Sequence, residues 1–160
     1  MFFSKSFGYA VRGVLYIALM QDEKHYVQVE EIASKLAAPK HFMGKILKKL
    51  VKENILQSVK GPSGGFTLTH ETLELPVMRL AVITDGTDFF DKCVLRVKEC
   101  DADNPCPLHY QVVEIRNKLK DVLVTTKIGE LLKENKADFI KSISTADVAS
   151  ILAAGKEEIF

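Results

Sequence analysis

Three cysteines and one histidine lie within seventeen residues of the chain, in the pattern Cys93-x6-Cys100-x5-Cys106-x2-His109. The chain contains no other cysteine. Thiolate and imidazole groups are the ligands that iron–sulfur clusters and zinc ions take in proteins, and four such groups complete one site. The spacing therefore predicts a metal site, and the predicted ligands are Cys93, Cys100, Cys106 and His109.

The same four residues are compatible with two other chemistries. Three thiolates and one imidazole also make a complete zinc site. Without a metal, clustered thiols can act as redox switches or simply pack together. An odd number of cysteines argues against a framework of intramolecular disulfides. The residues alone leave iron–sulfur, zinc and free thiols open as alternatives.

The bulk composition is that of an ordinary globular protein. The chain has 160 residues, 47% of them hydrophobic and 27% charged, which suits one domain or a small domain with an extension. The apolar run Val14–Met20 is short, and Arg12 interrupts the stretch before it, unlike a signal peptide. Because no run reaches the roughly 18 apolar residues of a membrane span, we expect a cytoplasmic protein with no membrane partner.

A basic segment stands out although the net charge is only +1. From Lys40 to Gly61 there are six lysines and a single acidic residue, Glu53. At about 100° per residue, a helix from Pro39 to Glu53 separates its apolar side chains, Met43, Ile46, Leu47 and Leu50, from a basic face with His41, Lys45, Lys48 and Lys52. Lysines that neutralise phosphates supply affinity for DNA. The alternative is a basic face that is merely solvated.

The elements around this helix follow the order of a winged helix-turn-helix. Helices are predicted over Ser6–Met20 and Val29–Leu36, before the basic helix. After it, a strand over Ile55–Lys60, a turn over Gly61–Gly65 and a returning strand over Phe66–Leu68 predict a hairpin. We therefore predict a mainly α fold with a small β-hairpin, in which the hairpin is the wing.

The basic helix and the wing are the predicted DNA-binding surface. His41 lies near the start of the helix, where recognition helices meet base edges. The glycines of the turn give the wing a thin tip that can approach a groove or a phosphate; a plain hairpin loop is the alternative. The predicted DNA contacts are Lys40, His41, Lys45, Lys48, Lys52, Lys60, Gly61, Ser63 and Gly64.

The second half of the chain is predicted to hold a long dimerisation helix. A connector over Thr69–Glu74 and a helix over Leu75–Asp85 precede the cysteine loop. From Leu108 to about Val124 the apolar residues recur at intervals of 3, 4 and 3, which is typical of a helix that packs on a partner helix. These residues are Val112, Ile115, Leu119 and Val122. Two further helical segments are predicted, Ile128–Lys133 and Thr145–Ala154.

Three predicted parts result. Residues 1–86 form a winged helix-turn-helix domain, residues 87–107 form the cysteine-rich loop, and residues 108–160 form the dimerisation helix with a helical extension.

Several segments resemble the Rrf2 family of bacterial winged-helix transcription regulators. They are Lys5-Ser-Phe-Gly-Tyr-Ala-Val-Arg12, the basic helix, the wing Val59-Lys-Gly-Pro-Ser-Gly-Gly-Phe66 and the three-cysteine loop. The resemblance extends to about Leu132. It implies a homodimer in which the long helix crosses to its partner, and a palindromic operator in double-stranded DNA as the target.

The resemblance also implies an iron–sulfur cluster. Cys93, Cys100 and Cys106 match the cysteines that hold the cluster in this family, and His109 matches the fourth ligand of its IscR-like members. In other members an aspartate near the N-terminus serves instead, but the matching position here is Gly8. The first two cysteines are separated by one residue more than is usual. This departure leaves the cluster type and the fourth ligand open. The favoured cofactor is a 2Fe–2S cluster, with a 4Fe–4S cluster as the alternative.

We thus predict a homodimeric regulator, with no enzymatic activity, whose operator binding depends on the cluster and responds to iron–sulfur status, redox state or nitric oxide. One alternative is a cluster-free regulator of the same fold that is controlled by a partner protein, zinc or thiol oxidation. An alternative of another class is an iron–sulfur electron-transfer protein. That alternative leaves the basic helix and the wing unexplained, and the sequence carries no nucleotide or flavin fingerprint.

Overall fold

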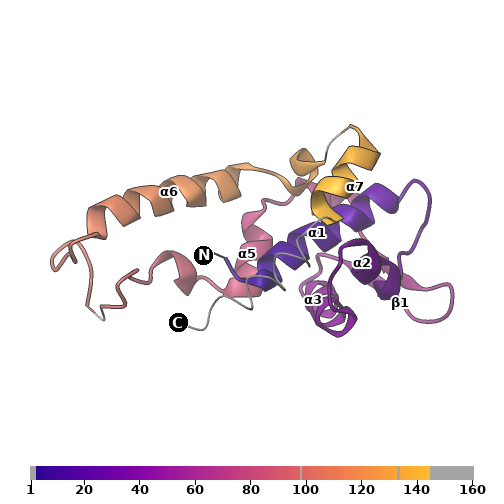
Figure 1. Ribbon diagram of the computed structural model, residues 1–160, viewed down its shortest axis with the longest axis horizontal. Helices are drawn as coiled ribbons and strands as arrows, with labels where there is room; N and C mark the ends of the chain where they lie inside the picture. Colours follow the sequence, from indigo (N-terminus) through magenta and orange to yellow (C-terminus); the bar gives the residue numbers. More distant parts are fainter. Residues whose placement is uncertain (1–2, 98, 133, 145–160) are drawn as a thin grey trace.

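The computed structural model describes residues 3–97, 99–132 and 134–144 (Figure 1). A helical body contains α1 (Lys5–Met20), α2 (Val29–Lys35), α3 (Lys40–Lys52) and α5 (Met78–Asp85). A long helix, α6 (His109–Thr125), and the loop that precedes it extend from this body as an arm (Figure 1). The fold is mainly α with one small hairpin, as predicted.

Helix α1 is the centre of the body. Ser4 begins it: the Ser4 hydroxyl accepts a hydrogen bond from the Phe7 amide, which satisfies a free donor of the first turn. The Ser4 amide and hydroxyl both bind the carboxylate of Asp85 at the end of α5. Because α1 packs against α3 and α5, it is apolar on most sides, and Val14 and Ile17 are fully buried.

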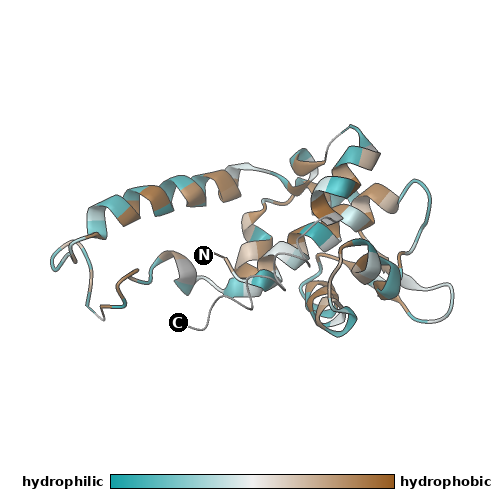
Figure 2. Ribbon diagram, viewed as in Figure 1, coloured by the Kyte–Doolittle hydropathy of each residue, from teal (hydrophilic) through white to brown (hydrophobic). Residues whose placement is uncertain are grey.

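The basic helix is α3, and its predicted division into two faces is confirmed. The apolar residues Met43, Ile46, Leu47 and Leu50 are all buried. The residues of the other face, His41, Lys45, Lys48 and Lys52, are all exposed. Brown inner faces and teal outer faces show the same division across the helices in Figure 2. The apolar contacts fix α3 on the body and leave its lysines in solvent.

The hairpin forms as predicted, but it is shorter and has an additional partner. Strands β1 (Gln57–Val59) and β2 (Gly65–Thr67) pair antiparallel, with Ser58 opposite Phe66. Ile55 and Leu56, predicted to start the first strand, are instead buried in the core. Val27, just before α2, exchanges two backbone hydrogen bonds with Phe66, at 2.9 and 2.8 Å. The wing is thereby tied to the helix-turn-helix.

Two helical segments were not predicted. The expected connector contains a short helix, α4 (His70–Glu74), which is held because the buried Thr72 hydroxyl donates to the Ile55 carbonyl at 2.7 Å. Helix α7 (Lys136–Ser144) buries Phe139 and Ile143. The predicted helix over Thr145–Ala154 lies outside the described residues.

Other boundaries differ by a few residues. Helix α5 begins at Met78 rather than Leu75, because the backbone around Leu75 pairs with the chain after α6: the Ile128 amide donates to the Leu75 carbonyl at 2.9 Å. The segment predicted over Ile128–Lys133 is a 3-10 turn, η2 (Ile128–Leu131). Another 3-10 turn, η1 (Asp88–Phe90), precedes the cysteine loop. Within the described residues, no helix is long and apolar enough to cross a membrane.

Candidate metal centre and nucleic-acid interface

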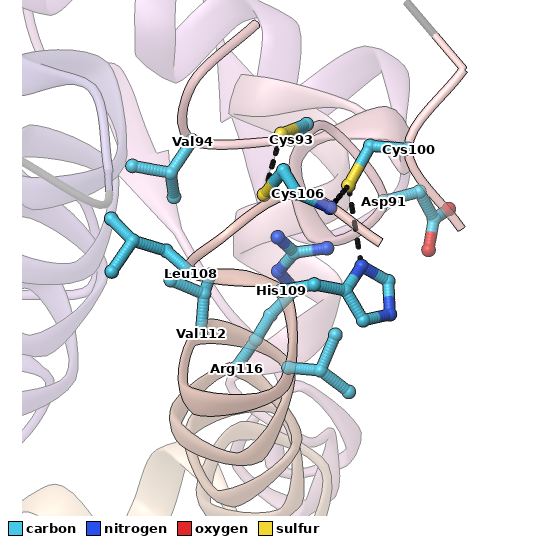
Figure 3. A pocket seen from close by; sticks show the side chains of 10 residues that line it. Asp91, Cys93, Val94, Cys100, Cys106, Leu108, His109, Val112 and Arg116 are labelled. Carbon is cyan, nitrogen blue, oxygen red and sulfur yellow. Dashed lines mark hydrogen bonds between the residues drawn. The ribbon is translucent and has the colours of Figure 1, made fainter. Parts of the chain in front are cut away.

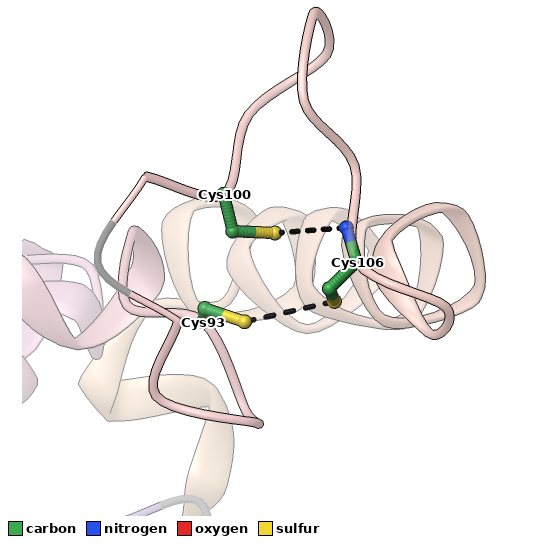
Figure 4. A group of neighbouring side chains, drawn as sticks. All are labelled: Cys93, Cys100 and Cys106. Carbon is green, nitrogen blue, oxygen red and sulfur yellow. Dashed lines mark hydrogen bonds between the residues drawn. The ribbon is translucent and has the colours of Figure 1, made fainter.

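The three cysteines of the loop come together at the outer end of the arm. The Sγ atoms of Cys93 and Cys106 are 3.6 Å apart, and the three Sγ atoms all lie within 4.8 Å of one another (Figure 4). All three cysteines are half-buried and free of disulfides. Soft ligands at this separation can bind one metal centre.

His109 reaches the same group from the first residue of α6. Its Nδ1 atom lies 3.2 Å from the Sγ of Cys100. The backbone also connects the two sides of the loop, because the Cys106 amide donates to the Cys100 Sγ at 3.4 Å and the His109 amide donates to the Cys106 carbonyl at 3.0 Å. The structure therefore groups the three predicted cysteine ligands and places the predicted histidine ligand beside one of them, Cys100.

A tight turn in the chain allows Cys100 and Cys106 to approach each other. The Asp101 carboxylate accepts hydrogen bonds from the amides of Asp103 and Asn104, at 3.0 and 2.8 Å. The Asn104 side chain donates to the Glu99 carbonyl at 2.7 Å. Asp and Asn favour such turns because their short side chains bind nearby backbone. The turn reverses the chain so that Cys100 and Cys106 face each other.

Arg116 holds the other side of the loop, and sequence reasoning missed it. Its two terminal nitrogens donate to the carbonyls of Phe90 and Lys92, at 2.6 and 3.0 Å. Figure 3 shows the guanidinium rising from α6 toward the cysteines, beside His109. The sequence did carry one signal for Arg116. It follows His109 by seven residues, so both side chains lie on one face of a helix.

A small cavity of about 50 Å³ lies between the loop and α6 (Figure 3). It is lined by the four predicted ligands together with Asp91, Val94, Leu108, Val112, Val113 and Arg116. The lining thus combines apolar side chains with the charged side chains of Asp91 and Arg116.

The surroundings shift the pKa values of Cys93 and Cys100 in opposite directions. A hydrogen bond from the Val97 backbone lowers the pKa of Cys93, and it outweighs the desolvation that opposes this shift. The Cys106 amide also acts to lower the pKa of Cys100, but desolvation and the two neighbouring thiols outweigh it, so the pKa of Cys100 is raised. Because the thiolate is the ligand and the reactive form, Cys93 is the more readily deprotonated of the two.

The predicted DNA-binding residues lie on the exposed side of α3 and on the wing. Lys40 pairs with Glu30 of α2 at 2.6 Å, while Lys60, Gly61 and Ser63 are exposed at the wing. Gly64 is buried. The backbone packs so closely around it that a Cβ there would lie 2.1 Å from the Val59 carbonyl oxygen. The Gln28 side chain donates to the Pro62 carbonyl at 2.6 Å, a wing contact that sequence reasoning also missed.

The predicted dimerisation residues lie along α6. Within α6, only Leu123 is buried. Ile115 and Val122 are 53% and 57% exposed, and Val112 and Leu119 are half-buried. Next to Val122 there is an open groove of about 400 Å³, whose apolar walls include Phe7, Val11 and Leu131. The part of the chain that the structure describes thus leaves an apolar face of α6 and an adjoining groove uncovered.

A helix-turn-helix with a basic second helix and an attached hairpin defines a winged-helix DNA-binding protein. A model of the Rrf2 family, described as "Iron-dependent Transcriptional regulator", matches residues 3–134. The chain therefore belongs to the Rrf2 family of transcription regulators.

Curated relatives agree with this assignment. A protein of Aquifex aeolicus (strain VF5), assigned as an HTH-type transcriptional regulator, is 33% identical over 134 residues, which cover 82% of this chain and 92% of the relative. The HTH-type transcriptional regulator IscR of Vibrio atlanticus (strain LGP32) is 26% identical over 141 residues, which cover 88% and 80%. The chain is thus similar to transcription regulators along most of its length.

Solved structures share the fold. CymR, the global cysteine regulator of B. subtilis, superposes with a TM-score of 0.64 at 18% identity, covering 80% of this chain and 93% of CymR. T. potens IscR superposes with a TM-score of 0.61 at 17% identity, covering 80% and 83%. Because one of these two neighbours is a cysteine regulator and the other is an IscR protein, the shared fold alone does not specify the signal.

Proposed function

We propose that this chain is a homodimeric transcription regulator whose operator binding is modulated by an iron–sulfur cluster. The observation that carries the proposal is the convergence of three sulfur atoms within 4.8 Å of one another, with His109 Nδ1 at 3.2 Å from Cys100. The names of the relatives support it, because the matching family model is described as iron-dependent and several relatives are IscR proteins.

The donor set fits an iron–sulfur cluster. The ligands form two close pairs, Cys93 with Cys106 at 3.6 Å and Cys100 with His109 at 3.2 Å, and a 2Fe–2S cluster takes two ligands on each iron. When bound, the cluster supplies a redox-active centre that oxygen or nitric oxide can attack. A histidine ligand raises the reduction potential of such a centre above that of an all-thiolate site.

Zinc is the second candidate. Two thiolates on one tetrahedral zinc are about 3.8 Å apart, given bonds of about 2.3 Å, and the separation of Cys93 and Cys106 is close to that value. A zinc site would hold the loop in place without redox chemistry. Assays of iron and sulfide separate the two candidates directly.

DNA binding is assigned to α3 and the wing. Lys45, Lys48 and Lys52 form an exposed row on α3, where they can neutralise phosphates in turn. His41 stands at the first turn of α3 and is the candidate for base contacts. Hydrogen bonds from Val27 and Gln28 to the hairpin fix the wing relative to α2, so the helix and the wing can bind DNA as one unit.

The proposed dimer uses the uncovered face of α6. Val112, Ile115, Leu119 and Val122 present an apolar row that a second copy of α6 can cover. Val122 belongs both to this row and to the wall of the groove beside Phe7 and Val11, so the apolar surface continues onto α1. A two-fold symmetric dimer covers such a surface on both copies at once.

A packed path links the cysteine loop to the DNA-binding helix. Phe90, just before the loop, is buried, and its ring centroid lies 6.5 Å from that of Phe3. Phe3 in turn packs on Phe7 of α1 at 4.4 Å, and α1 packs on α3. A cluster that orders the loop therefore acts on a segment that touches the DNA-binding body.

The test is anaerobic purification, with assays of iron, sulfide and visible absorption, followed by operator titration. Cluster-bound and cluster-free protein are compared at one salt concentration. A coupling of typical size changes operator affinity about 5- to 150-fold between the two forms. Equal affinity and equal sequence preference in both forms would remove the sensing role, even with a cluster present.

A further inference from the structure

The segment that enters the cysteine site depends on a contact from α6. Local hydrogen bonds, such as Lys92 N–H to the Asp88 carbonyl at 3.1 Å and Arg96 N–H to the Cys93 carbonyl at 2.9 Å, join near neighbours in the sequence. They shape the segment but do not fix it against another element. Arg116 does so, because it binds the carbonyls of Phe90 and Lys92 from α6.

The position of Arg116 on α6 matches that of His109. Seven residues separate them, which is about two helical turns or roughly 10 Å along the axis, and both side chains line the same cavity. His109 contacts Cys100, while Arg116 holds the residue immediately before Cys93. One face of α6 thus positions the first two cysteines, and the third lies three residues before the helix.

We propose that Arg116 is the positioning residue of the metal centre: its forked side chain fixes the backbone before Cys93 so that the Cys93 thiol meets the thiols of Cys100 and Cys106. The inference rests on the proposed function, in which these residues hold a metal. A guanidinium offers two parallel donors in a rigid plane, whereas an ammonium is a single point. The shape of the fork, and not only its charge, is therefore required.

The position of Arg116 also bears on dimerisation, because α6 carries the exposed Ile115 next to it in sequence. The fork therefore joins the metal loop to the helix that we assign to the dimer contact.

The test compares three variants with the wild-type protein. Arg116→Gln removes the charge and the fork, and Arg116→Lys keeps the charge but lacks the fork. Lys118→Gln is the control, since it removes one positive charge from the same helix and breaks only an exposed pair with Glu114. The measurements are the rate of cluster loss to a chelator, followed by visible absorption, and hydrogen exchange in the metal-free protein.

Partners that orient metal ligands typically contribute 10- to 100-fold to metal affinity. We therefore expect Arg116→Gln and Arg116→Lys both to lose the cluster at least about tenfold faster than the wild type, while Lys118→Gln matches it. In the metal-free protein, the rate of amide hydrogen exchange should rise over residues 88–94 in both Arg116 variants and stay unchanged over α3. This readout detects a loosened loop independently of the cluster.

Two results overturn the proposal while leaving the proposed function intact. If the wild type is loaded and Arg116→Gln loses its cluster at the wild-type rate, Arg116 does not position the site. If Arg116→Lys behaves as the wild type, charge suffices and the fork has no role. A wild-type protein that takes up neither a cluster nor zinc overturns the proposed function and this inference together.

Discussion

The sulfur atoms of Cys93 and Cys106 lie 3.6 Å apart although thirteen positions separate the two residues in the chain. A disulfide would bring them to about 2.05 Å, and the two thiols instead form a hydrogen bond. The separation is close to that of two thiolates on one metal ion. The loop thus brings together thiols that could bind one metal centre, and the turn at Asp101 and the hydrogen bonds of Arg116 lie on either side of them.

Replacing Cys106 by serine should abolish the metal centre. The hydroxyl of serine is a far weaker soft-metal ligand than a thiolate, so anaerobically purified Cys106→Ser should lack visible cluster absorption and contain almost no iron or sulfide. Ala102→Ser, which adds the same hydroxyl at an exposed position of the same loop, is the control and should keep both. Wild-type absorption in Cys106→Ser would exclude Cys106 as a ligand.

Removing the imidazole should have a milder effect. His109→Ala leaves three thiolates in place, so a cluster can still assemble with water or another group as the fourth ligand. We expect an altered spectrum and cluster loss about 10- to 100-fold faster than in the wild type. Gln111→Ala is the matched control, because Gln111 is exposed in the same first turn of α6, and it should keep the wild-type spectrum and loss rate. Identical spectra and loss rates in His109→Ala and the wild type would assign the fourth ligand elsewhere.

The sequence predicted the DNA-binding half of the fold because its signals are local. Apolar residues at helical spacing identified α1, α2 and α3, and glycines at 61, 64 and 65 identified the turn of the wing. The pairing of Val27 with Phe66 escaped prediction because it is a single contact between residues distant in the sequence. Helix α7 carried a usable signal: Phe139 and Ile143 are four residues apart and both are buried.

The sequence predicted which cysteines gather at the site, but not which residues support the loop. Side chains that bind metals are rare residue types at short spacing, so the sequence displays them. Arg116 instead binds two backbone carbonyls, and every residue has a carbonyl, so nothing in the sequence marks its partners. The spacing from His109 could indicate only that both side chains share one face of α6.

The exposed lysines of α3 should contribute to DNA binding regardless of sequence. The double variant Lys45→Ala/Lys48→Ala removes two charges from the face opposite the buried Met43 and Leu50. Binding to specific and non-specific DNA should weaken together, and the slope of log affinity against log salt should fall by about one for each phosphate that is no longer neutralised. Titration by fluorescence anisotropy at several salt concentrations measures both quantities.

The control for this prediction is Lys118→Ala/Lys120→Ala, which removes two charges from α6 instead. Both lysines are exposed and lie outside the proposed interface with DNA. This variant should retain the wild-type affinity and salt slope. Unchanged affinity and slope in the α3 variant would show that α3 is not the helix that meets DNA.

The wing should depend on Gly64. A methyl group at this position would lie 2.1 Å from the Val59 carbonyl oxygen and 2.8 Å from its carbon, so Gly64→Ala must displace the backbone of the hairpin. We expect operator affinity to fall severalfold and the melting temperature to fall as well, because Gly64 is buried against the backbone of Val59 and Lys60. Ser58→Ala, at an exposed position of β1, should bind as the wild type does. Wild-type binding by Gly64→Ala would separate the wing from DNA recognition.

The face of α6 should determine the oligomeric state. Ile115 is 53% exposed in the single chain, so Ile115→Asp should leave the fold of each copy intact while placing a carboxylate in the proposed dimer contact. Burying an unpaired charge in an apolar contact costs about 3–5 kcal/mol, which raises the dimer dissociation constant roughly 10²- to 10⁴-fold. Sedimentation velocity should then show monomers at concentrations where the wild type is dimeric.

Asn117→Asp adds the same charge two residues further along α6, at an exposed position outside the apolar row, and should remain dimeric. A dimer of Ile115→Asp that is as stable as the wild type would place the contact on another surface, and the groove beside Phe7 and Val11 would then be the next surface to test by substitution.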